Sequence, residues 1–145
     1  MNEIYASENA AERERLVRLT SQLTKADLAR ELDDGWTIAA QLAHLAFWDQ
    51  YALSLVEGWE RNGFVKVTLV SVDALNEAAH LLSDAIPPPA AIQLAQAAAE
   101  AMDRKLETIT PELAAAIEAG GHIRVLRRAL HRREHLDEIE KVLGA

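Results

Sequence analysis

Two histidines four residues apart near the end of the chain point to metal chemistry. His131 and His135 lie in the segment ALHRREHLDEIE, residues 129–140, which has the charged amphipathic pattern of a helix. Positions i and i+4 of a helix share one face and bring side chains to about 6 Å of each other at Cβ, so the two imidazoles could bind one metal ion. His135 is also in line with Ile139, which indicates that the pair faces the protein interior.

A metal site needs at least one further ligand, because two imidazoles complete only half of a tetrahedral shell. His44 is the candidate, within DGWTIAAQLAHLAFWD at residues 34–49. It begins a stripe that continues through Trp48 and Tyr51 and is mostly apolar and aromatic. Three histidines on two facing helices would leave a coordination position for water or substrate. Spacing alone also allows an interpretation without a metal. In it, His44 is a hydrogen-bonded core residue, and His131 and His135 are a partly exposed pair.

The elements that must position these residues are all predicted to be helical. Half of the residues are hydrophobic but only 5% are aromatic, and the abundance of alanine favours closely packed helices. Four principal helices predict an all-α, four-helix up-down bundle, with or without a crossover. We expect short extra helical segments and one domain over residues 1–145. Caps, prolines and glycines place helices at about 8–23, 38–59, 72–85, 87–108 and 123–143, short segments after Thr24 and Thr110, and a loop at 64–70.

Composition excludes several classes of function. A net charge of −8 argues against nucleic-acid binding and against anionic membrane surfaces. No segment approaches 18 uncharged apolar residues, and the first residues contain no apolar signal-peptide core. The chain has no cysteine, so it offers no disulfide, thiolate nucleophile or thiolate ligand. We expect a cytoplasmic protein whose partner is a small-molecule substrate.

The two histidine segments resemble the motifs of the DinB-like superfamily. These are DNA-damage-inducible four-helix bundle proteins related to mycothiol-dependent maleylpyruvate isomerases and bacillithiol transferases. DGWTIAAQLAHLAFWD is similar to the first histidine motif, and LHRREHLDEIE to the closing His-x3-His motif. The resemblance implies a divalent metal, most commonly zinc or nickel, held by His44, His131 and His135. It does not imply DNA binding, in agreement with the net charge.

A three-histidine metal ion would acidify a bound water or thiol, because neutral ligands leave the ion its full charge. The resemblance suggests a low-molecular-weight thiol cosubstrate such as mycothiol or bacillithiol, and hence S-transfer or thiol-dependent isomerisation. Metal-assisted hydrolysis is the alternative enzyme function. A non-catalytic helical bundle that binds a small ligand or forms a homodimer, with a vestigial metal site, is the alternative of another class.

Other polar and aromatic residues near the motifs are candidate pocket residues. We expect Trp48 and Tyr51 to line a pocket or fill the core, and Arg128 to be able to hold a carboxylate. For the arginines of this region, the stronger expectation is solvated i, i+4 pairs with acidic residues or interactions with neighbouring helices. Four further residues are expected to lie outside the site or to orient its ligands poorly: Trp36, taken as an anchor for the helix that begins at residue 38, and His80, His122 and Asp49.

Overall fold

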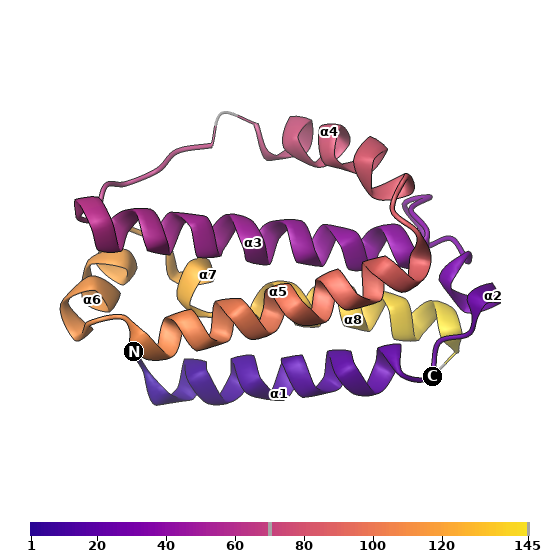
Figure 1. Cartoon of the computed structure of the whole chain (residues 1–145), viewed down its shortest axis with the longest axis horizontal. Coiled ribbons are helices and arrows are strands. Elements are labelled where there is room, and N and C mark those ends of the chain that lie inside the picture. The colour runs from indigo at the N-terminus through magenta and orange to yellow at the C-terminus, as the bar shows by residue number, and fades with distance from the viewer. Residues whose placement is uncertain (70, 145) are drawn as a thin grey trace.

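The computed structural model describes residues 1–69 and 71–144 and contains, in those ranges, helices and no strand (Figure 1). The helices are α1 (Glu3–Thr20), α2 (Lys25–Leu28), α3 (Ile38–Asn62), α4 (Val72–Asp84), α5 (Pro88–Thr108), α6 (Pro111–Ala119), α7 (Ile123–Leu126) and α8 (Ala129–Leu143). The all-α prediction is confirmed. The predicted loop is confirmed at residues 64–69, and Val70 lies outside the described residues.

The starts of α2, α3, α4 and α6 follow from capping residues seen in the sequence. Thr37 caps α3 by accepting the backbone N–H of Ala40, and Thr24 forms a capping box with Asp27. The predicted start of the first helix after Ser7 is wrong, because the Asn2 side chain accepts the N–H of Ile4 and starts α1 at Glu3. α1 also ends earlier than predicted, at Thr20.

Four of these helices, α1, α3, α5 and α8, form a bundle (Figure 1). α1 and α3 run in opposite directions, whereas α3 and α5 run in the same direction because the connection that contains α4 returns over the length of α3. α8 then runs opposite to α5. A crossover connection, which the sequence left open, is therefore present between α3 and α5.

The core consists of two clusters of buried apolar side chains along α3. One cluster joins the first half of α3 to α5 and α8, and the other joins its second half to α5, α6 and α7. Ala91, Ala95 and Ala99 are at most 1% exposed and face the core at spacing i, i+4. Small side chains on this face let α5 lie close to α3, because the distance between packed helices depends on the side chains at the contact.

The last predicted helix, residues 123–143, is in fact two helices with a break. Arg127, between α7 and α8, has φ −104° and ψ 69°, outside the helical region. Asn9 of α1 satisfies the backbone at the break: its side-chain Nδ2 donates to the carbonyl oxygen of Leu126, and its Oδ1 accepts the N–H of Ala129, both at 2.8 Å. A continuous helix was predicted because no proline or glycine marks the break in the sequence.

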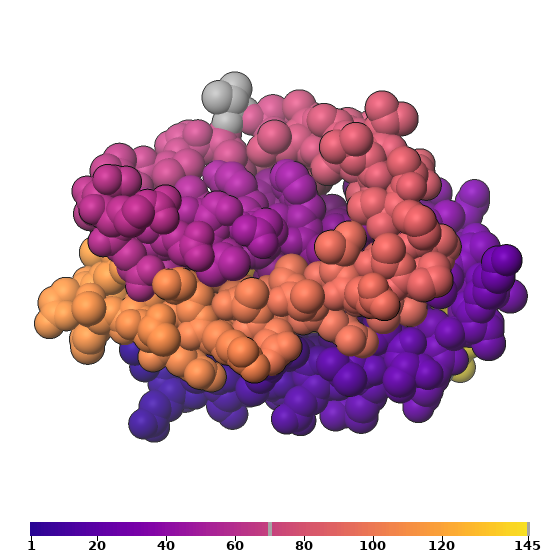
Figure 2. Space-filling model, in the orientation of Figure 1, coloured from indigo at the N-terminus to yellow at the C-terminus, as the bar shows by residue number. Residues whose placement is uncertain are grey.

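α4 covers α3 loosely. Val72 is 47% exposed and Leu82 is 70% exposed, and only Ala79 and Ser83 of α4 are buried. Figure 2 shows α4 at the edge of the face formed by α3 and α5, with the surface hollowed where the three helices meet. None of the described helices is long and apolar enough to cross a membrane.

Candidate metal centre

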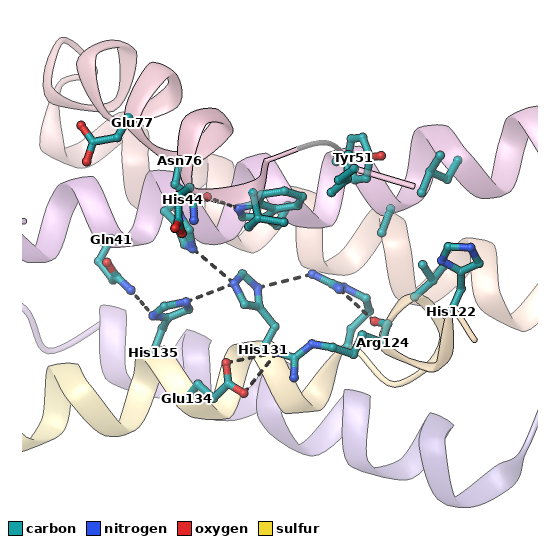
Figure 3. A pocket seen from close by; sticks show the side chains of 18 of the residues that line it. Gln41, His44, Tyr51, Asn76, Glu77, His122, Arg124, His131, Glu134 and His135 are labelled. Atoms are coloured by element: carbon teal, nitrogen blue, oxygen red, sulfur yellow. Dashed lines mark hydrogen bonds and ion pairs between the residues drawn. The ribbon is translucent and has the colours of Figure 1, made fainter. Parts of the chain in front are cut away.

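Three imidazole rings from two helices converge on one point inside the bundle (Figure 3). His44 lies on α3, and His131 and His135 lie one turn apart on α8. The Nε2 atom of His131 is 3.2 Å from that of His44 and 3.1 Å from that of His135. The structure thus brings together the three histidines that the sequence singled out, and one ligand atom of each lies within 4.8 Å of the others.

The geometry of the three rings fits a metal ion. In a tetrahedral zinc site with ordinary zinc–imidazole bonds, two ligand nitrogens are about 3.3 Å apart. The two measured Nε2–Nε2 distances are close to that value. Three Nε2 atoms that face one common point cannot all form hydrogen bonds with one another. A cation at that point would instead accept a lone pair from each of the three rings.

Burial keeps His44 and His131 in the neutral form that binds metal. The pKa of His44 is lowered to about 4, first by burial and then by the neighbouring His135, while Asp34 acts in the opposite direction. The pKa of His131 is lowered further, again first by burial and then by the positive charge of Arg128. Both rings therefore carry a free lone pair at neutral pH, as ligation requires.

The second ring nitrogen of each histidine, Nδ1, is the outer nitrogen of the cluster, and its contacts differ among the three rings. His135 Nδ1 contacts the Gln41 side-chain amide and lies 3.3 Å from Oε2 of Glu138. This carboxylate can accept a hydrogen bond from an Nδ1–H group and so direct Nε2 inward. His44 is only 7% exposed, yet its Nδ1 has no hydrogen-bond partner among the described residues. His131 Nδ1 faces a guanidinium nitrogen of Arg128 at 3.4 Å. Glu138 is thus the one acidic group in reach of an outer nitrogen within the described chain.

Arg128 belongs to a buried ion network, which corrects the expectation of solvated pairs. Its Nε donates to Asp49 at 2.7 Å, and the second oxygen of Asp49 accepts from Arg132 at 3.2 Å. Arg132 is fully buried and also binds Asp103. Of the arginines in this region, Arg124 does form an exposed pair, with Glu134. Asp49 was expected to orient the site poorly, but through Arg128 it positions the cation beside His131.

The other arginine pairs reach α1 rather than neighbours on α8. Arg127 binds Glu8, and Arg133 binds Glu12. For these two arginines the interaction with a neighbouring helix, one of the two arrangements expected from the sequence, is the one observed, because their side chains face the helix that packs against α8.

An open pocket of about 840 Å³ lies over the histidines. Trp48, Tyr51 and Arg128 line it, as expected from the sequence, together with apolar side chains of α3, α4 and the loop before α4. Two residues that we had placed outside the site, Trp36 and His122, also line this pocket. Trp36 meets the His44 ring edge-on at a centroid distance of 5.4 Å.

Trp36 and His122 lie at positions that no sequence pattern connects to the site. Trp36 precedes its helix, and His122 lies in the turn before α7, so neither occupies a position in a periodic stripe. His80, also placed outside the site, does not line the pocket but stacks on Trp36 at a centroid distance of 3.8 Å. The loop brings Val67 to His122, whose Nε2 accepts the Val67 N–H at 3.2 Å.

The fold and the site define a class: an all-α bundle that gathers three histidines, one buried and two partly buried, at an open pocket. Comparison with known families places the chain within that class. Residues 9–138 match the mycothiol maleylpyruvate isomerase N-terminal domain, and the chain belongs to this family. Neither the curated proteins nor the solved structures compared with the chain include a match.

Proposed function

We propose that the protein is a metal-dependent enzyme that activates the thiol of a low-molecular-weight cosubstrate for S-transfer or isomerisation. The observation that carries the proposal is the convergence of the Nε2 atoms of His44, His131 and His135 at the pocket. The family description, which names mycothiol, agrees with a thiol as the reacting group. The identity of the metal, zinc or nickel, is part of the proposal.

A divalent ion held by the three histidines would supply a positive charge that lowers the pKa of an incoming thiol. The protein's own residues bind and position the reactants. Trp48 and Tyr51 form an apolar wall of the pocket, which excludes water from one side of the bound molecule. The thiol must come from a cosubstrate, because the chain has no cysteine.

Arg128 acts on the site through its charge. Its guanidinium is held by Asp49 and lies beside His131, where it opposes protonation of that ring. His131 therefore stays neutral without help from the metal.

Metal content of the untagged protein tests the site. We expect close to one zinc or nickel per chain after incubation and dialysis, and loss of nearly all of it in His44→Ala and in His135→Ala. His80→Ala is the matched control, since His80 lies outside the three-histidine cluster and should keep its metal. Failure of the unsubstituted protein to bind either metal would contradict the proposal.

Turnover is tested separately, with an electrophilic aryl chloride and a panel of low-molecular-weight thiols. We expect thiol consumption that depends on the metal and is lost in His44→Ala but retained in His80→Ala. A protein that binds the metal stoichiometrically but transfers none of the thiols, mycothiol and bacillithiol included, would instead support a non-catalytic ligand-binding bundle.

A further inference from the structure

Gln41 is a buried amide beside the candidate metal centre. Every residue of α3 from Ile38 to Ala46 is buried, and Gln41 and His44 are the polar residues among them. The two are three positions apart and so share a face of the helix. Gln41 is only 2% exposed, and a polar side chain at such a depth needs hydrogen-bond partners to offset the loss of water.

The partners of Gln41 lie on α8. Among the described residues, its side-chain amide contacts Nδ1 of His135 and lies 3.5 Å from Oε2 of Glu138 (Figure 3). The other ring nitrogen of His135, Nε2, faces His131. Gln41 therefore holds the His135 ring at its outer nitrogen, on the side away from the three-histidine cluster.

This contact bears on which nitrogen of His135 carries the proton. A neutral imidazole has one N–H and one lone pair, and the hydrogen bond made by one nitrogen decides the state of the other. In the structure, the amide nitrogen of Gln41 is the end that faces Nδ1. If it donates to Nδ1, the proton of the ring is on Nε2, and Nε2 has no lone pair for a metal ion. Ligation through Nε2 instead requires the proton on Nδ1 and an acceptor opposite it.

A half-turn of the Gln41 amide about its terminal bond supplies that acceptor. The nitrogen and oxygen of an amide have nearly the same size, so the half-turn keeps the side chain in place and exchanges a donor for an acceptor. Glu138 is the alternative acceptor, but its side chain is 50% exposed, so water competes for its oxygens. Its distance of 3.3 Å from Nδ1 is also longer than an ordinary N–H···O hydrogen bond.

We propose that Gln41 is a positioning residue that fixes the tautomer of His135. Its Oε1 accepts the Nδ1–H of the ring, which leaves the lone pair of the ring Nε2 directed at the metal position. This inference rests on the proposed function, because it takes His135 to be a metal ligand. It assigns the orientation of that ligand to the buried amide rather than to Glu138, and it gives a reason for a polar residue at a buried position of α3.

The test measures zinc affinity of the full-length protein by competition with a zinc indicator. Gln41→Leu keeps a side chain of similar size but removes the acceptor, and we expect zinc to bind about ten-fold more weakly, as when a metal-bound histidine loses its hydrogen-bond partner. For Glu138→Gln we expect a loss below about three-fold. If Gln41 were a donor to Nδ1, Gln41→Leu would free Nε2 and bind zinc more tightly.

Gln96→Leu is the matched control. Gln96 lies on α5, donates to Thr20 at 2.8 Å and lines none of the described pockets. The variant removes the same amide and one hydrogen bond, and it should leave the zinc affinity unchanged. Circular dichroism of each variant checks that the helices remain folded.

Proton NMR of the zinc-loaded protein, with nitrogen-15 in its histidines, is a second measurement that does not depend on a variant. An Nδ1–H bonded to a buried amide is protected from exchange with water, so we expect His135 to give a separate Nδ1–H resonance. The resonance should be lost in Gln41→Leu and persist in Gln96→Leu and Glu138→Gln. A merely structural role of Gln41 would lower stability in urea without this loss.

Two results would overturn the inference: zinc affinity in Gln41→Leu that equals or exceeds that of the unsubstituted protein, or no protected Nδ1–H of His135 in the zinc-loaded protein. In either case the proposed function stands, provided that the unsubstituted protein binds zinc and transfers a thiol. If Gln41→Leu loses affinity and the resonance but the unsubstituted protein transfers no thiol, the inference stands and the proposed enzymatic function is wrong. Absence of zinc binding by the unsubstituted protein overturns both.

Discussion

Arg128 and Asp49 form a buried ion pair of 2.7 Å that places a guanidinium beside the candidate metal ligand His131. Asp49 is 1% exposed and also forms an ion pair with Arg132, so one carboxylate balances two buried cations. Asp103 forms a second ion pair with Arg132. A buried pair of this kind costs desolvation energy and adds little net stability, but removal of one partner leaves the other charge uncompensated.

Asp49→Asn should therefore destabilise the protein strongly. We expect the free energy of unfolding, measured in urea, to fall by about 3 kcal/mol because Arg128 and Arg132 would lose a shared counter-charge. Asp137→Asn, which removes an exposed carboxylate paired with Arg15, should cost less than about 1 kcal/mol. Equal effects of the two substitutions would contradict the role assigned to Asp49.

The lowered pKa of His44 predicts a pH dependence of stability in the metal-free protein. Between about pH 6.5 and pH 4 the unfolded chain binds a proton at this residue that the folded chain does not. The contribution of His44 to the free energy of unfolding is therefore fully present above about pH 6.5 and is lost as the pH falls from there toward about pH 4. We expect His44 to account for a loss of about 2 kcal/mol between about pH 7.5 and pH 4.5.

The comparison that isolates this contribution is with His44→Leu. Urea unfolding at several pH values should show a shallower dependence in the variant than in the unsubstituted protein. Parallel curves would show that His44 titrates normally in the folded state.

Asn9 should be important for stability although it lies far in sequence from the helices it joins. Asn9→Ala removes both hydrogen bonds at the break between α7 and α8 and leaves the buried backbone groups of Leu126 and Ala129 unpaired. We expect a loss of about 2–3 kcal/mol in urea unfolding. Asn62→Ala, at an exposed position at the end of α3, is the control and should change stability by less than about 0.5 kcal/mol.

The hydrogen bond from Trp48 to Asn76 should restrain α4 against α3. In Asn76→Ala we expect amide hydrogen exchange in residues 72–84 to accelerate about five-fold, corresponding to the loss of about 1 kcal/mol, with little change elsewhere. Leu81→Ala changes a residue of the same helix that is 77% exposed, and it should leave these exchange rates unaltered. Uniform acceleration over the whole chain would instead indicate global destabilisation.

The amino-acid sequence by itself determined most of the helical segments, apart from the start of α1 and the break before α8, and the pairing of His131 with His135. Helix starts such as those of α3 and α4 depend on caps within a few residues, and the facing of residues i and i+4 follows from helix geometry. These interactions are local, so they can be predicted without knowledge of the fold. The same reasoning, with the resemblance of both motifs, correctly selected His44 as the third member of the cluster.

Only the tertiary structure decided what surrounds that cluster. The break before α8 depends on Asn9 of α1, and the burial of Arg128 depends on Asp49 of α3. The pocket likewise requires α4 to return over α3, because Val72, Asp73, Asn76 and Glu77 of α4 form part of its lining. Such contacts join residues that are distant in the chain, and their energies depend on burial, which no local pattern of residues specifies.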